Sequence, residues 1–442
     1  MNRRILNLAI PNILSNLSVP LLGAVDTALM GHLEEAYYLG AIAIASIIFD
    51  FVYWGFGFLR MGTTGLTAQA YGHDNHEEIG LLLIRALLVS LSVGLVLILS
   101  QTFISQLGFS LVEATPEVEK YAKIYFFIRI FDAPATLSLY VWQGWFLGMQ
   151  NARYPLYITI FVNVLNLGFN LLFVKYYGMK ADGIAWGTLI AQYGGVLFAI
   201  TLFMLKYRQY AQKYSFQRVM DKAALQRFFS VNRDIFIRTL CLIFTFSFFT
   251  AKGAEFGEVI LAANAILMTL WMILAYGVDG FAFAAESLVG NYVGKLSSKP
   301  GLYDEYKKTI WLLFYWAAGL SALVSVVYAF FGTEILRIFT DQVQVIEMAQ
   351  TFLVWIIIAP VINSVCFIWD GIYIGATRTQ AMRNAMLVCT FLVFLPVFYA
   401  TKGVLGNHGL WLAMLVFMIA RGITLSWLAR KHIFHYPKTA SA

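Results

Sequence analysis

An acidic side chain, Asp26, lies inside an otherwise apolar stretch near the start of the sequence, in VDTALMGHL (residues 25–33). An ionised carboxylate near the centre of a bilayer costs roughly 2.5–3.5 kcal/mol on insertion scales, so membrane proteins keep one mainly where an ion or substrate passes. We therefore interpret Asp26 as an ion-binding group, provided that the stretch spans a membrane. The alternative is a structural acid that pairs with a neighbouring amide close to the membrane interface.

Three amide side chains recur with helical spacing in another apolar stretch, FVNVLNLGFN (residues 161–170). Asn163, Asn166 and Asn170 are separated by three, four and seven residues, which places them on one face of a helix. Such a polar stripe has to face protein or water and not lipid. One asparagine would be ordinary helix packing, whereas three predict the lining of a cavity, which Thr188 in GIAWGTLIAQ would complete.

The second half of the sequence carries its own candidate acids. Asp279 and Glu286 are seven residues apart on one helix face, and Asp370 stands where the matching motif of the first half has Gln143. Asp279 and Asp370 are therefore candidates for a second-lobe cation site, with helix packing as an equally good interpretation of Asp370. Gln143 and Asn163 are candidates for the substrate cavity.

The other ionisable side chains in apolar stretches have a simpler interpretation. Within the first half, Asp26 is the only acid that we expect inside the spans. Four arginines are expected near span ends, where long side chains reach the interface by snorkelling: Arg60, Arg129, Arg238 and Arg421.

The overall composition decides the class of protein. Of 442 residues, 60% are hydrophobic and 12% are charged, whereas a soluble domain carries about 25% charged residues. The sequence thus predicts an all-α polytopic membrane protein. Its three cysteines lie in apolar runs without a CxxC pair, which excludes a disulfide framework. No nucleophile–histidine or multi-histidine set lies inside the apolar stretches, so we do not expect an enzyme.

A membrane-spanning helix needs about 20 apolar residues. By this criterion we expect twelve spans, at about 5–30, 38–70, 79–103, 121–149, 154–175, 183–206, 230–252, 259–292, 306–331, 346–373, 382–401 and 408–430.

Lysine and arginine are unevenly distributed between these spans. With a cytoplasmic N-terminus, the cytoplasmic segments hold most of them, and the outer loops hold only Lys120, Lys123, Lys175, Lys180, Lys252, Arg337 and Lys402. This bias follows the positive-inside rule. We therefore expect both termini in the cytoplasm and the protein in the cell (inner) membrane. The net charge of +7 is then a topology signal, and no nucleic-acid partner is needed to explain it.

The two halves of the sequence repeat each other at a nearly constant offset. LGA (39–41), QAYG (69–72) and WQGWFLG (142–148) precede LAA (261–263), NYVG (291–294) and WDGIYIG (369–375) by 222, 222 and 227 residues. We expect an N-lobe at 1–206, a basic cytoplasmic linker at 207–229 and a C-lobe at 230–442. A basic helix on the membrane surface is a compatible reading of the linker. The repeat equivalent of Asp26 is Phe248, so the lobes are not chemically equivalent.

Taken together, these segments resemble those of multidrug and toxic compound extrusion (MATE) transporters, most closely the DinF-like subfamily. The resemblance covers nearly the whole chain. The matching segments are VDTALMGHL (25–33), QAYG (69–72), LNLGFN (165–170), NRDIFIRTLC (232–241), LAANAIL (261–267), VDGFAFAAE (278–286) and FIWDGIYIGATRTQAMRNAM (367–386).

The resemblance implies twelve transmembrane helices in two six-helix pseudo-symmetric lobes around a central cavity. It also implies secondary active multidrug efflux, in which amphipathic, often cationic organic compounds are exported in exchange for protons or sodium ions. By the resemblance, Asp26 is the coupling carboxylate of the N-lobe, Asn166 is its amide partner and Thr188 belongs to the same cluster with Asn170. We expect no cofactor beyond the coupling ion, which is H+ or, at Asp26, Na+. The expected partners are small organic substrates and the lipid bilayer, and we expect a monomer.

Two prolines in helix one bear on the mechanism, and so do two departures from the family pattern. Pro11 matches the proline that kinks helix one in relatives, and with Pro20 it removes two backbone hydrogen bonds, so that the helix is able to bend. Many relatives carry Asp where this chain has Asn170, which argues against a sodium site with two carboxylates. Helix seven offers no acid in Thr239–Thr250 that would partner Asp370.

Two other functions are compatible with repeated helical bundles. A flippase for lipid-linked precursors, from the same superfamily, would need a strongly basic cavity for phosphates, whereas the lysines and arginines here lie mostly in loops. A channel would need a re-entrant filter segment, and the sequence shows no such pattern.

Overall fold

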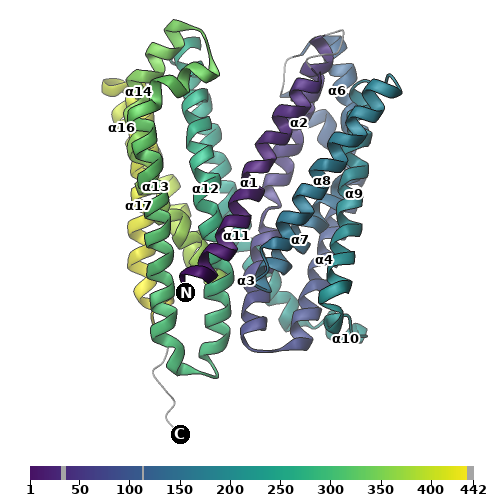
Figure 1. Cartoon of the computed structure of the whole chain (residues 1–442). Coiled ribbons are helices and arrows are strands. Elements are labelled where there is room, and N and C mark those ends of the chain that lie inside the picture. The colour runs from purple at the N-terminus through teal and green to yellow at the C-terminus, as the bar shows by residue number, and fades with distance from the viewer. Residues whose placement is uncertain (31–35, 112–113, 436–442) are drawn as a thin grey trace. The chain divides into compact units, whose positions relative to one another are not determined.

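The computed structural model is built from α-helices (Figure 1). It describes residues 1–30, 36–111 and 114–435, and of residues 19–30 and 36 it describes only the backbone. No strand occurs within these ranges, which confirms the all-α prediction.

Eleven stretches of the described chain are long and apolar enough to cross a membrane, and α1 (Asn2–Met30) coincides with the remaining expected span. The eleven are built from α2 (Ala36–Gly55) with α3 (Phe58–Gly72), α4 (His76–Leu99), α6 (Pro116–Arg129) with α7 (Ala133–Gly148), α8 (Arg153–Leu171), α9 (Ala181–Lys206), α10 (Phe216–Val219) with α11 (Lys222–Ala254), α12 (Glu258–Leu296), α13 (Tyr303–Phe339), α14 (Val343–Gly375), α15 (Thr379–Val388) with α16 (Leu395–Leu405), and α17 (Asn407–His432). The shorter elements are α5 (Gln101–Ser110), η1 (Ile130–Asp132), η2 (Leu172–Tyr176), η3 (Arg208–Tyr210), η4 (Pro300–Leu302) and η5 (Cys389–Phe394).

The chain divides into two compact units. The N-unit comprises Leu14–Phe228, and the C-unit comprises Met1–Ile13 together with the chain from Phe229 onward. The expected linker at 207–229 therefore belongs to the N-unit except for its last residue, and the first thirteen residues belong to the C-unit. Both divisions fall inside continuous helices, α1 and α11.

The first residues of α1 join the C-unit because α12 allows a close approach. A methyl group at Gly280 would lie 2.8 Å from the carbonyl oxygen of Ala9 and 3.1 Å from the amide nitrogen of Ile13. The indole of Trp316 on α13 also donates to Asn2 at 3.3 Å. Small residues that let backbones approach are the usual packing device of membrane helices, where apolar burial alone gives little driving force.

The repeated WxGxxxG segments use the same device. On α7, a methyl group at Gly144 would lie 2.3 Å from the carbonyl oxygen of Arg60 on α3. On α14, methyl groups at Gly371 and Gly375 would lie 2.3 Å and 2.5 Å from carbonyl oxygens of α12. In both units the motif brings two helix backbones into contact, so its function is packing.

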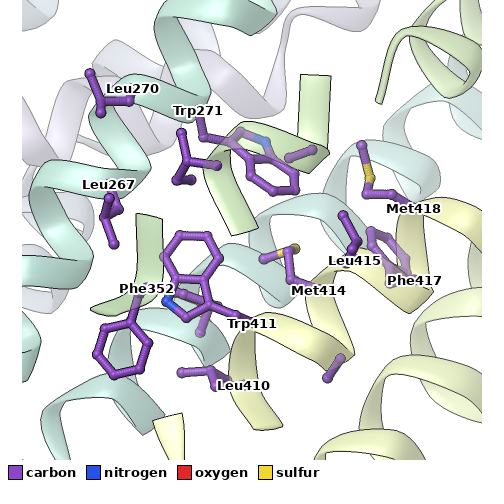
Figure 2. Close-up of a cluster of buried hydrophobic side chains, with 14 of the residues drawn as sticks. Leu267, Leu270, Trp271, Phe352, Leu410, Trp411, Met414, Leu415, Phe417 and Met418 are labelled. Carbon is purple, nitrogen blue, oxygen red and sulfur yellow. The ribbon is translucent and has the colours of Figure 1, made fainter. Parts of the chain in front are cut away.

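The core of the C-unit is apolar and aromatic. Figure 2 shows side chains of α12, α14 and α17 meeting there, with Trp271 and Trp411 6.3 Å apart between ring centroids. Three polar side chains at its edge bond one another. Asn264 and Asn407 donate to each other at 2.8 Å and 3.0 Å, and the Trp411 indole donates to Asn264 at 2.9 Å. Internal satisfaction of this kind is required where no water reaches the polar groups.

The basic segment between α9 and α11 is fastened to the N-unit. Arg85 of α4, which is buried, donates through Nε to the carbonyl of Val219 at 3.0 Å and through Nη2 to that of Arg218 at 2.6 Å. The same guanidinium forms an ion pair with Glu78 at 3.0 Å. Asn151, in the turn after α7, donates to Tyr207 Oη at 3.1 Å. Docking removes the Tyr207 phenol from water, and this burial raises the pKa of Tyr207 to about 12.

Candidate functional site

A chain of buried amide and hydroxyl groups connects α8 to α9 in the N-unit. Asn170 Nδ2 donates to Asn166 Oδ1 at 3.0 Å, and Asn166 Nδ2 donates to Thr188 Oγ1 at 3.0 Å. All three side chains are buried. The four-residue spacing on α8 stacks the two amides one turn apart, and Thr188 faces them from α9. The structure thus brings together three of the residues predicted from the sequence.

Close approach of α9 makes this arrangement possible. A methyl group at Gly187 would lie 2.1 Å from Asn170 Oδ1 and 3.2 Å from the backbone nitrogen of Asn170. Only a residue without a Cβ fits beside Asn170 in this packing. Gly187 is thus a further residue of the site, and its one sequence signal is that it directly precedes Thr188.

The second half of α1 lies along α8. Ser15 and Thr159 share a hydrogen bond of 2.9 Å between their hydroxyls, and Asn163 Nδ2 donates to Ser18 Oγ at 3.4 Å, which is a weak bond. Asn163 is only half-buried. It therefore belongs to the α1–α8 contact, one turn away from the buried amides.

Two predicted residues of helix one fall where side chains are not described. Asp26 and Pro20 lie on the α1 backbone, and their side chains lie outside the described residues. Pro11 is described and half-buried, and α1 is a continuous helix across both prolines.

In the C-unit, Asp370 lies between two arginines. Arg238 of α11 and Arg421 of α17 both donate to Asp370 Oδ2, the latter at 2.7 Å. The exposed fractions are 8% for Arg238, 1% for Arg421 and 4% for Asp370. Two guanidinium groups against one carboxylate give this cluster, which we call the C-unit triad, a net charge of +1.

The triad corrects the expectation that these arginines snorkel to the interface. Both guanidiniums point into the packed unit, because the buried Asp370 carboxylate compensates their charge there. At the interface, water would do so by solvation. Helix seven offers Asp370 no acid in Thr239–Thr250, but it does offer a cation, Arg238, one residue earlier.

Two further predicted residues, Asp279 and Gln143, do not join the amide chain or the C-unit triad. Asp279 is half-buried on α12, and Gln143 is half-buried on α7 beside the close glycine contact with α3.

Two acids of the N-unit were missed, and the prediction that Asp26 is the only acid of the first-half spans is wrong. Asp50 lies on α2 and Asp132 in η1, within the expected spans 38–70 and 121–149. Asp132 is fully buried and accepts hydrogen bonds from Tyr53 and Thr136. Its ion-pair partner is Arg129, at 3.5 Å, which had also been assigned to the interface. The signal was available, since Arg129, Asp132 and Thr136 recur at spacings of three and four.

Comparison with known protein families gives one match over most of the chain. The family model MatE matches residues 11–172 and 235–400. The sequence is 38% identical over 429 residues to DNA damage-inducible protein F of Escherichia coli (strain K12), an alignment that covers 96% of this chain and 91% of that protein. It is 24% identical to Protein DETOXIFICATION 44, chloroplastic, of Arabidopsis thaliana, over 96% of this chain and 81% of the relative.

Solved structures share the fold. A structure of a Vibrio cholerae MATE transporter mutant superposes with a TM-score of 0.85 at 18% identity, over 98% of each chain. Another, of a multidrug resistance MATE family transporter of the MOP superfamily in an outward-facing conformation, superposes with a TM-score of 0.84 at 17% identity. It covers 97% of this chain and 94% of that one.

Proposed function

The chain belongs to the MATE family of membrane transporters, and on this premise we propose that it exports amphipathic, often cationic organic compounds in exchange for H+, with Na+ as the alternative ion. It is a multi-pass membrane protein and not an enzyme. What has to be explained is how binding of an ion and binding of a substrate oppose each other.

The observation that carries the proposal is the buried amide–hydroxyl chain of Asn166, Asn170 and Thr188. Polar side chains buried within a membrane span are costly and typically mark ion or substrate pathways. These three present adjustable donors and acceptors without a fixed charge. A carboxylate that changes its protonation state needs such neighbours, because an amide can donate to the anion or accept from the acid.

The register of α1 on α8 supports Asp26 as that carboxylate. The contacts Ser15–Thr159 and Ser18–Asn163 pair residues 144 and 145 apart in sequence. Continued along two parallel helices, the same offset brings the backbone of Asp26 to the level of Asn170. Both the family resemblance and this register therefore point to one N-unit site.

In the proposed cycle, Asp26 alternates between an anion and a neutral acid. Protonation removes a charge and changes the hydrogen bonds that the carboxyl group can form with the amides. Ion and substrate need only favour different conformations, since a ligand shifts an equilibrium solely by its differential affinity. Pro11 and Pro20 are the proposed hinge of α1.

The driving force is sufficient for concentrative export. One proton that enters across 100 mV supplies about 2.3 kcal/mol, and each 1.4 kcal/mol corresponds to a tenfold concentration ratio. For a neutral substrate, a single proton thus supports more than a tenfold gradient before any pH difference is added. Exchange of one proton for a singly charged cation moves no net charge, so there the pH difference alone drives export.

The deciding variant is Asp26→Asn, which keeps size and hydrogen bonding but fixes the neutral form. We expect it to fold and to lose efflux driven by a proton gradient, measured per folded molecule in proteoliposomes. Asp26→Glu should retain part of the activity because the ionisable group survives. Full activity of Asp26→Asn would contradict coupling through this residue and favour the structural interpretation. Parallel runs with imposed proton and sodium gradients identify the ion.

We place the protein in the cell (inner) membrane with both termini in the cytoplasm, as a monomer. A flippase for lipid-linked precursors remains the competing proposal. The structure gives it no support within the described residues, because the buried arginines Arg85, Arg238 and Arg421 and the half-buried Arg129 each pair with an acid.

A further inference from the structure

Two polar stripes face each other in the N-unit, on elements that the proposed cycle does not use. One lies on α2 and the other runs from the end of α6 through η1 into α7, each with the three- and four-residue spacing of a helix face. Their members are Ser46, Asp50 and Tyr53 on α2, and Arg129, Asp132 and Thr136 on the facing segment. We call these six residues the N-unit network.

The contacts within the network centre on Asp132. Tyr53 Oη donates to Asp132 Oδ1, and Thr136 Oγ1 donates to the same oxygen at 3.2 Å. Arg129 Nε lies 3.5 Å from the other oxygen, Oδ2. The Arg129 guanidinium also stacks over the Phe49 ring at 4.7 Å and donates weakly to Ser46 at 3.4 Å. The anion of Asp132 is thus held from three directions.

The network lies at the depth where a charge is most costly. Asp132 is the midpoint of the 33-residue span Pro116–Gly148, and η1 interrupts the span at that point. The facing span, Tyr37–Gly72, is interrupted after Gly55, near its own middle. Transporters commonly place ion sites at discontinuous helices near mid-membrane, and a 3₁₀ turn within a helix often marks a functional hinge.

The charges of the network do not balance. Asp50 and Asp132 contribute two negative charges and Arg129 one positive charge, which leaves a net charge of −1. Arg129 is engaged by Asp132, so Asp50 shares a cation that is already paired. Asp50 is exposed at the edge of this packing, whereas Asp132 is fully buried. An exposed, uncompensated carboxylate at this depth needs water and a proton to be tolerated.

The groups that surround the pair come from four elements. Tyr53 faces it from α2, Arg129 from α6 and Tyr140 from α7. Tyr193 of α9 donates to the carbonyl of Phe131 at 3.0 Å, beside Asp132. The tyrosines remain neutral near pH 7. Among the described side chains, Arg129 is the permanent charge that acts on both acids, and Arg60 adds a second one beside Tyr140.

From this arrangement we propose that Asp50 is a second proton-binding carboxylate of the N-unit, and that Arg129 and Asp132 are its positioning residues. The proton comes from water on one side, forms an O–H bond on Asp50 and returns to water on the other side. Binding neutralises the network.

Arg129 gives the site two arrangements. With Asp50 protonated, the guanidinium serves Asp132 alone, as the structure shows. With Asp50 ionised, the Arg129 guanidinium is attracted to two carboxylates, one on α2 and one in η1. The packing of α2 against η1 then differs from that in the protonated state. The inference rests on the proposed function, since it assumes that protons drive the transporter.

The test uses the full chain, with Asp50→Asn and Asp50→Glu as variants. The matched control is Asp221→Asn, which removes an equal charge from the polar segment before α11, where the side chain accepts from the Ala224 amide at 2.8 Å and asparagine can do the same. The first readout is the pH profile of proton-driven efflux in proteoliposomes. The second is infrared difference spectroscopy of titrating carboxyl groups, which requires no transport.

We expect Asp50→Asn to lose one titrating carboxyl band and to lose part of the pH dependence of efflux. Asp50→Glu should keep both, and Asp221→Asn should match the parent protein.

If the parent is driven by protons and Asp50→Asn changes neither readout, the inference is wrong and the proposed function stands. If the parent is not driven by protons but Asp50→Asn still loses the band, the proton site stands and the coupling proposal is wrong. An Asp50→Asn variant that does not fold leaves the Asp50→Glu titration to decide, because absence of a band shift there would contradict the proposal.

Discussion

The N-unit network and the C-unit triad are built from the same kinds of residue but carry opposite net charges. The network has two acids and one arginine, and the triad has one acid and two arginines. In the network, neutral hydroxyl donors share the stabilisation of Asp132, whereas in the triad the contacts to Asp370 come from guanidiniums. A site with spare negative charge can gain a proton, while a site with spare positive charge repels cations. From this comparison we propose that the ion-binding chemistry lies in the N-unit and that the triad is structural.

Among variants that test this comparison, we expect the largest loss of stability from a substitution of Asp370. Asp370→Asn leaves two buried guanidiniums without a counter-charge, so we expect a loss of about 3–5 kcal/mol in the free energy of unfolding. Denaturation in detergent micelles measures it. A triple variant, Arg238→Met with Asp370→Leu and Arg421→Met, removes every charge and should recover most of the loss. If the triple variant is stable but no longer couples efflux to an ion gradient, the triad is part of the ion path and the comparison fails.

A smaller effect is expected at Tyr53. Tyr53→Phe removes one donor from an ionised acid that keeps Thr136 and Arg129, so we expect a loss of about 1.5–3 kcal/mol in unfolding free energy. Tyr193→Phe is the matched control, because its hydroxyl donates to a neutral carbonyl, and it should cost about 0.5–1.5 kcal/mol. Equal losses in the two variants would show that the Asp132 bond is not charge-assisted.

The third effect concerns the neutral amide chain. Gly187→Ala places a methyl group 2.1 Å from Asn170 Oδ1, and overpacking of this kind typically costs about 1–3 kcal/mol. Gly168→Ala on α8 meets nothing within 4 Å and should not destabilise the protein. The same unfolding measurement compares the two. A tolerated Gly187→Ala would mean that Asn170 moves freely and that the chain is not a fixed site.

The sequence alone predicts what depends on local spacing. The apolar runs locate the spans, the stripe in FVNVLNLGFN locates Asn166 and Asn170, and the WxGxxxG repeat predicts close helix packing. Each of these signals lies within one helix, so no knowledge of neighbouring helices is needed. The division of α1 after Ile13 was less accessible, because it falls inside a continuous helix where neither composition nor charge changes.

The arginine interpretation was wrong for a related reason. Arg238 is 132 residues from Asp370 and Arg421 is 51 residues from it, so only tertiary packing brings the three together. Snorkelling is a sound expectation for an arginine whose surroundings are lipid, but it does not hold where a buried carboxylate is within reach. The network could have been found, since Arg129 and Asp132 recur on one face close to a helix break.

The division of α1 between the units has a consequence for how the protein is made. Residues 1–13 leave the ribosome well before α12, whose Gly280 receives them. At synthesis rates of about 5–20 residues per second, this interval lasts roughly 15–50 s. The N-unit can assemble during that time, while the start of α1 has no packing partner in the C-unit. During membrane insertion this segment therefore lacks its C-unit packing partners until α12 has been synthesised.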